Sequence, residues 1–174
     1  MTVCIAAACE GGSKIVVCAD RMFTATAPIN LEFETEEQKI EDLASTCTAL
    51  LSGNSGLGTE VLNEARSKMA GSQTRPIMEV ATMVKDGYIS VRGKKAIETI
   101  VIPTVGQDFV SFQSRGGTLP QYLQVQPQIY QQLVATMNQF NMGLDAIIAG
   151  LDTVGDAHGA HIYRVTHPGT AYCL

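Results

Sequence analysis

Four residues of this chain could together carry out nucleophilic catalysis: Thr2, Asp20, Lys39 and Gly53. Once the initiator Met is removed, Thr2 would carry a free amine beside its own hydroxyl, so that the hydroxyl attacks and the amine takes the proton. An ordinary α-amine, with a pKa of about 7.7–8.0, suits a base working near neutrality. Lys39 would favour the neutral amine by its positive charge, and Asp20 would hold Lys39. The Gly53 backbone N–H could stabilise an oxyanion.

The elements that would position these residues begin with two β-rich runs. Residues 2–9 and 14–21, separated by EGGS, predict a hairpin that returns Asp20 beside Thr2. The small residues of the first run predict close packing on both faces, as in a layered sandwich. Residues 22–38 are expected to form a loop. A second strand pair is expected around IEDLA and TCTALLSG, with Lys39 at its entrance.

Apolar residues at helical spacing then predict three helices. One follows SGNSGLGTE, one begins at Pro76 and continues up to Pro103, and one spans 120–139, after a loop over 103–120. Strands are expected at LDAIIAGLD and AHIYRVTHPGT. The order is therefore four strands, three helices and two strands, which indicates a single α+β domain over residues 1–174, built in layers.

Composition narrows the function. A net charge of -5 argues against nucleic-acid and anionic-membrane partners, and the apolar stretches are far shorter than the ~20 residues of a membrane span. The beginning of the chain lacks the pattern of a signal peptide, so we expect a cytoplasmic protein. The five cysteines stand apart in apolar runs, as buried reduced thiols do, and no metal site or cofactor is expected. The basic cluster RGKK at 92–95 is expected to be a solvated helix face.

Other motifs lack a residue that their chemistry requires. GNSGLGT at 53–59 has the glycine spacing of a phosphate loop, but Thr59 stands where the lysine is required. Ser55 lacks the G-x-S-x-G frame of a nucleophile elbow. The three histidines are expected at turns or strand surfaces, too far apart to share a metal: His158, His161 and His167.

Taken together, these segments resemble the proteasome β-type group of N-terminal nucleophile hydrolases, which includes the HslV peptidase and the bacterial Anbu proteins. MTVCIA is similar to the Anbu start, and the hairpin ending in CADR places the family's acidic residue and following arginine on Asp20 and Arg21. QKIEDLASTCTALLSG places the family lysine on Lys39 and the closing glycine on Gly53. IIAGLDTVGDAHGAHIYRVTHPGT resembles the strand pair after the central helices. The resemblance covers most of residues 2–70 and 140–170.

The resemblance implies a four-layer αββα sandwich that assembles into homo-oligomeric rings, with Thr2 facing an inner chamber. It implies a cofactor-free peptidase that acts on a peptide or protein through an acyl-enzyme, and an ATPase partner cannot be read from it. The predicted substrate pocket consists of Arg21, Cys47, Ala49 and Leu51. The family continues past the position of Leu174 with residues that support the nucleophile, so the sandwich is expected to be truncated after the sixth strand and to expose an apolar face.

Two other functions stay open at this point. An amine could resolve the same acyl-enzyme in place of water, which would make the protein a peptide ligase. The chain could also be a non-catalytic structural ring subunit, in which Thr2, Asp20 and Lys39 have no chemical role. The absence of the family's C-terminal supporting residues favours that structural alternative.

Overall fold

The computed structural model describes residues 3–25, 31–34, 39–69, 75–106, 127–152 and 159–174. The fold is mixed α/β, and all of its described sheets are antiparallel. The chain forms two compact units: Met1–Tyr88 together with Gly143–Leu174, and Ile89–Met142. Every described residue of the candidate site belongs to the first unit.

A five-stranded sheet forms the centre of the first unit, in the order β5-β6-β7-β8-β9. Its strands are β5 (Ile40–Ala44), β6 (Cys47–Gly53), β7 (Leu144–Asp152), β8 (Gly159–Thr166) and β9 (Thr170–Cys173). The expected strands at β5 to β8 are confirmed. The expectation that strands end at β8 is wrong, because the chain turns back after Thr166 and pairs Thr170 with it.

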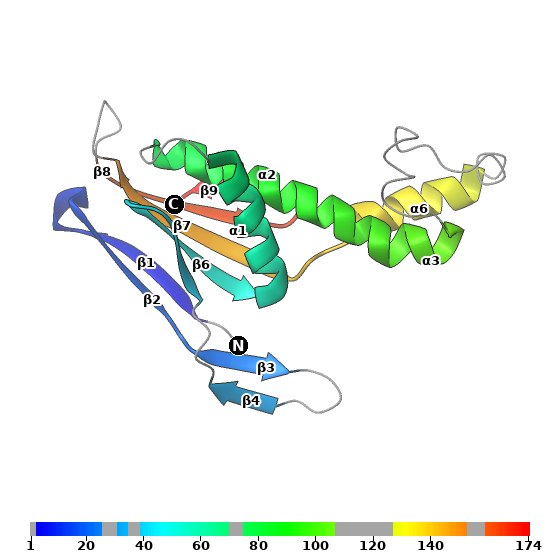
Figure 1. Cartoon of the computed structure of the whole chain (residues 1–174), viewed down its shortest axis with the longest axis horizontal. Helices are drawn as coiled ribbons and strands as arrows, with labels where there is room; N and C mark the ends of the chain where they lie inside the picture. The colour runs from blue at the N-terminus through cyan, green and yellow to red at the C-terminus, as the bar shows by residue number, and fades with distance from the viewer. Residues whose placement is uncertain (1–2, 26–30, 35–38, 70–74, 107–126, 153–158) are drawn as a thin grey trace. The chain divides into compact units, whose positions relative to one another are not determined.

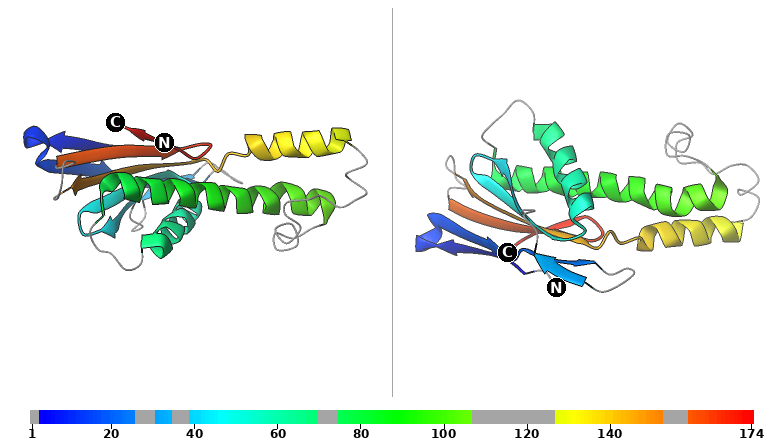
Figure 2. Two further views of the ribbon diagram at one scale, coloured as in Figure 1. Left: turned by 90° about the horizontal axis from the view of Figure 1, so that it is seen from above. Right: turned by 60° about the horizontal axis from the view of Figure 1, so that its bottom comes forward.

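Two helices cover one face of this sheet, α1 (Ser55–Met69) and the first part of α2 (Ile77–Ala96) (Figure 2). Leu51 and Leu144 point toward α1, where a Cβ on Gly58 would lie 2.8 Å from Leu51 Cδ1 and 3.4 Å from Leu144 Cδ1. The helix therefore packs directly on β6 and β7. The buried side chains of this layer include Ala49, Val61, Leu62, Ala65, Ile77, Val80, Val84 and Ile148.

The hairpin of β1 (Cys4–Cys9) and β2 (Lys14–Ala19) lies against the other face of the sheet (Figure 1). Its expected strands are confirmed, and Cys4 pairs with Ala19. The other side of the hairpin is apolar and open, because Val3, Ile5 and Val16 are 44%, 54% and 59% exposed. Among the described residues, the first strand is therefore packed on one face and open on the other, unlike the expected packing on both faces. The described layers are helices, sheet and hairpin.

A second hairpin occupies part of the segment that was expected to be a loop. β3 (Met22–Ala25) pairs with β4 (Leu31–Glu34), with Phe23 opposite Phe33. The loop expectation was wrong there because LEFE alternates apolar and charged residues with the period of a strand, although over only four residues. Residues 35–38 lie outside the described residues.

The second unit is helical. α2 ends at Ala96 and is followed by a π-helical turn, η2 (Ile97–Val101), and by α3 (Ile102–Val105). Helix α6 (Pro127–Gln139) packs Leu133 against Ile97 and Val101. The helix expected to reach Pro103 is thus continued through a π turn, and Pro103 stands in the first turn of α3, where a proline is tolerated. The expected loop and helix residues at 107–126 lie outside the described residues.

Arg92 does not lie on a solvated helix face, as the RGKK cluster had suggested. Its Nε donates to Phe140 O at 2.9 Å, and its Nη2 donates to Asn138 O at 2.6 Å and to Met137 O at 3.1 Å. These carbonyls stand at the end of α6, where backbone oxygens have no partner within the helix. Arg92 therefore caps α6.

Candidate active site

The end of β2 places the Asp20 carboxylate beside the start of β1. The hairpin register puts Asp20 opposite Val3: Asp20 N donates to Val3 O at 3.0 Å, and Val3 N donates to Asp20 Oδ2 at 2.8 Å. Thr2 itself lies outside the described residues. Thr2 is joined to Val3 by a peptide bond. The Asp20 carboxylate therefore accepts a hydrogen bond from the backbone amide directly after the predicted nucleophile.

Lys39 reaches the same carboxylate from the central sheet. It is 7% exposed and directly precedes β5, and its Nζ donates to Asp20 Oδ1 and to Met22 O. These bonds join the central sheet to the hairpin. The pKa of Asp20 is lowered from its ordinary value, first by the Lys39 hydrogen bond and then by the Val3 N–H. The ionised carboxylate is thus the stable form beside the ammonium.

The Gly53 amide lies on the same side of β6 as Lys39. Asn54 N donates to Gly143 O at 3.1 Å, toward β7, whereas Leu51 N donates to Lys39 O at 2.8 Å, toward β5. Because bonding directions alternate along an antiparallel strand, the Gly53 N–H is directed toward the β5 side. Gly53 has φ of 101°, and a Cβ there would lie 1.8 Å from Gly143 O. Glycine can occupy this position because it has no Cβ and tolerates a positive φ.

The structure places the predicted pocket residues in two different settings. Arg21 is exposed and follows Asp20 directly. Cys47, Ala49 and Leu51 are 3%, 0% and 5% exposed and alternate along β6 on its helix-covered face. As placed here they contribute to the core, and their role in substrate binding stays a prediction.

Sequence reasoning did not find the groups that complete this site. Two are main-chain groups, the Val3 N–H and the Met22 carbonyl, which hold Asp20 and Lys39. The third is the Cys4 thiol, whose Sγ lies 3.5 Å from Leu51 O. Main-chain partners leave no residue-type signal in a sequence, whereas the position of Cys4, two residues after Thr2, could have drawn attention to its thiol.

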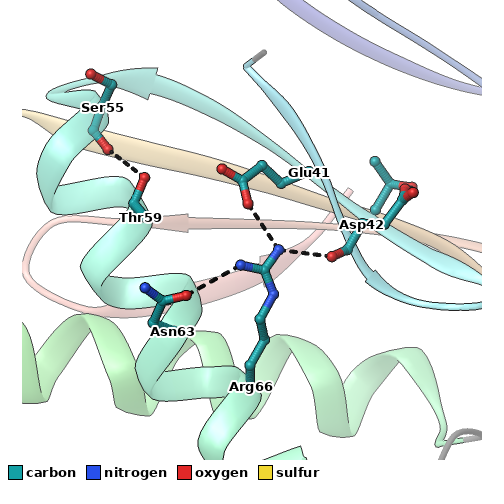
Figure 3. Close-up of polar contacts among 7 residues, drawn as sticks. Glu41, Asp42, Ser55, Thr59, Asn63 and Arg66 are labelled. Carbon is teal, nitrogen blue, oxygen red and sulfur yellow. Dashed lines mark hydrogen bonds and ion pairs between the residues drawn. The ribbon is translucent and has the colours of Figure 1, made fainter. Parts of the chain in front are cut away.

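The strand that begins after Lys39 is anchored to α1 by an arginine (Figure 3). Arg66 Nη2 donates to Glu41 Oε2 and to Asp42 O, both at 2.8 Å, and its Nη1 donates to Asn63 Oδ1 at 3.3 Å. Ion pairs of such partly exposed side chains stabilise little by themselves. Their geometric effect is to hold β5, and with it Lys39, against the helix that follows Gly53.

A second polar cluster, at the start of α2, is structural. Asp152 is 8% exposed and accepts the Ile77 N–H at 2.9 Å, as a capping carboxylate does at a helix N-terminus. His161 Nε2 lies 3.6 Å from Asp152 Oδ2, and the His161 side chain is partly exposed, as expected for a strand surface. Burial, and next the Asp152 charge, raises the pKa of Cys47 to about 12, so that this thiol stays protonated.

Within the described residues there is no group of three or more histidine, cysteine or acidic side chains that could hold a metal ion. None of the helices described is long and apolar enough to cross a membrane. No family model matches the chain, and no curated protein is significantly similar to it. Any function must therefore be argued from the residues of the site.

Proposed function

We propose that this chain is a proteasome-type N-terminal-threonine amidohydrolase, a peptidase that acts through an acyl-enzyme on Thr2. One observation carries the proposal. The Asp20 carboxylate binds Lys39 Nζ with one oxygen and the Val3 N–H with the other, one peptide link from Thr2. A buried lysine that an acid holds close to Thr2 suits an amine base at Thr2. The positive charge of the lysine disfavours protonation of that amine.

In the proposed reaction the Thr2 hydroxyl attacks the carbonyl carbon of the substrate amide while its proton passes to the Thr2 α-amine. The Gly53 N–H stabilises the oxyanion of the tetrahedral intermediate. Collapse breaks the C–N bond, and the leaving amine takes the proton. Water, deprotonated by the same α-amine, then cleaves the ester and regenerates Thr2. Lys39 supplies positive charge, and Asp20 keeps Lys39 in place.

The proposal extends to architecture and assembly. The layering of helices, five-stranded sheet and β1–β2 hairpin supports the proposal of an αββα sandwich. The open apolar face of Val3, Ile5 and Val16 fits a hairpin that is covered in the working protein. We propose a cytoplasmic, homo-oligomeric ring with Thr2 on its inner wall and peptides or proteins as substrates.

The test is the intact mass of the purified protein before and after incubation with a threonine-reactive β-lactone. We expect loss of the residue before Thr2 and one adduct, which peptide mapping places on Thr2. Thr2→Ala should abolish the adduct at an unchanged oligomer size, and Lys39→Met should move acylation to higher pH. Lys14→Met, which alters an exposed lysine, is the matched control. An adduct on Thr2→Ala, or no adduct on the unaltered chain, would refute the proposal.

A further inference from the structure

The Cys4 thiol stands in the candidate site, and the proposed reaction gives it no task. Its Sγ lies 3.5 Å from Leu51 O and is partly buried between the hairpin and the central sheet. The charged groups around it are Lys39 and Asp20, and Cys18 is also near. Burial raises the pKa of Cys4, and the opposing Lys39 charge is the smaller effect, so the thiol keeps its proton and can donate it to a carbonyl.

The backbone of Leu51 contacts both Lys39 and Cys4. Its N–H donates to Lys39 O at 2.8 Å, its carbonyl accepts from Cys4 Sγ, and Gly53 follows two residues later on the same strand. A shift of Cys4 relative to Leu51 therefore changes the position of the first strand relative to the oxyanion amide.

Among the described residues, two polar contacts connect the start of β1 with the central sheet, and they differ in kind. The Val3–Asp20 bonds lie within the hairpin, so they reach the central sheet through the Asp20–Lys39 ion pair. The Cys4–Leu51 contact is direct. The hairpin also packs on β6, β7 and β8, so these two polar contacts fix the position of its first residues rather than its general placement. The precision of the site, more than its stability, should then depend on the weaker thiol contact.

We propose that Cys4 is a positioning residue, whose thiol fixes the start of β1 against Leu51 and so aligns Thr2 with the Gly53 N–H. This role rests on the proposed function. A misplacement of about 1 Å in a reacting group can lower a rate by up to about 10²-fold. Because the ion pair remains, we expect a loss of about tenfold, below that limit.

The experiment measures the rate constant and the final extent of Thr2 acylation by the β-lactone, across pH, from intact mass and peptide mapping. Cys4→Ala should reach full acylation about tenfold more slowly, with the pH midpoint unchanged. Cys4→Ser keeps a donor and should restore the rate to within about twofold. Cys9→Ala is the matched control, because Cys9 lies on the same strand and its Sγ contacts Ala7 O at 3.7 Å, within its own strand.

The outcomes separate the two proposals. An unlabelled native chain refutes the proposed function and the role of Cys4 with it. A labelled native chain with an unchanged rate in Cys4→Ala refutes the role of Cys4 alone. Incomplete labelling at the native rate would mean that Cys4 contributes to folding instead of alignment, which also overturns the proposal. If Cys4→Ala does not fold, Cys4→Val fills the volume without a donor and must show the same slow, complete acylation.

Discussion

Replacing Gly53 by alanine tests the backbone of the candidate site most directly. An alanine at φ of 101° leaves the ordinary backbone regions, which costs about 1–2 kcal/mol. Its Cβ would lie 1.8 Å from Gly143 O, against about 3.5 Å for ordinary non-bonded contact. Relieving such an overlap by backbone movement costs typically about 1–3 kcal/mol. Gly53→Ala should therefore lower the free energy of unfolding by about 2–5 kcal/mol.

Gly143→Ala separates the two contributions. Gly143 also has a positive φ, 63°, but a Cβ there would meet nothing within 4 Å. That variant should lose about 1 kcal/mol, from φ alone. Both can be measured by urea unfolding followed by far-UV circular dichroism, provided that the m-values agree. Equal losses in the two variants would refute the argument that the close approach to Gly143 requires glycine at position 53.

Gly53→Ala also tests the oxyanion assignment. Moving β6 away from Gly143 displaces the amide at position 53, and loss of one oxyanion donor typically lowers the rate about 10²–10³-fold. The rate constant of Thr2 acylation, corrected for the folded fraction, should fall by that order. A corrected rate equal to that of the native chain would exclude the Gly53 N–H as the donor.

Three further predictions concern single groups. The lowered folded-state pKa of Asp20 contributes stability above its unfolded value of about 3.9, and that stability disappears as pH falls through the folded value. The urea midpoints of the native chain and Asp20→Asn should thus converge below about pH 4, and a constant gap from pH 6 to pH 3 would contradict the linkage. Arg92→Met removes charged hydrogen bonds to three carbonyls at and just after the end of α6 and should cost about 1.5–3 kcal/mol in urea unfolding, against less than about 0.5 for the surface control Lys14→Met. Cys47, with a pKa of about 12, should resist a thiol reagent at pH 8 while the exposed Cys18 and Cys173 react, and early labelling of Cys47 would show that the layer between β6 and the helices opens in the native state.

Much of the fold could be predicted because its long elements carry strong periodic signals. The apolar runs of β6 and β7 and the 3.6-residue spacing in α1 indicate their own structure without knowledge of their neighbours. The first hairpin was predicted to return Asp20 beside Thr2. The structure pairs Asp20 with Val3, one residue further along, because Cys9 pairs with Lys14 across the turn. Loop geometry fixes the register of a hairpin, and a list of turn-forming residues does not reveal it.

The missed features depend on partners distant in the sequence or on very short segments. β3, β4 and β9 have four residues each, too few for alternation to stand out. The carbonyls that Arg92 caps come 45 to 48 residues later in the sequence. The basic residues next to Arg92 therefore led to the wrong prediction of a solvated helix face. Within the candidate site, Asp20 and Lys39 were predictable as residue types. Their main-chain partners at Val3 and Met22 required coordinates.

The burial of Lys39 is itself an argument about function. Replacing a buried ion pair by apolar side chains is often neutral or stabilising, so stability alone gives little reason for a lysine at the junction of two sheets. Lys39→Met leaves Asp20 without its ammonium partner, whereas Asp20→Asn with Lys39→Met removes both charges. The double variant should therefore unfold at a urea concentration at least as high as the single Lys39→Met variant, and neither should acylate Thr2 at neutral pH. Acylation of the double variant at the native rate would show that the pair only joins the sheets, and the amine of Thr2 would then need another source of activation.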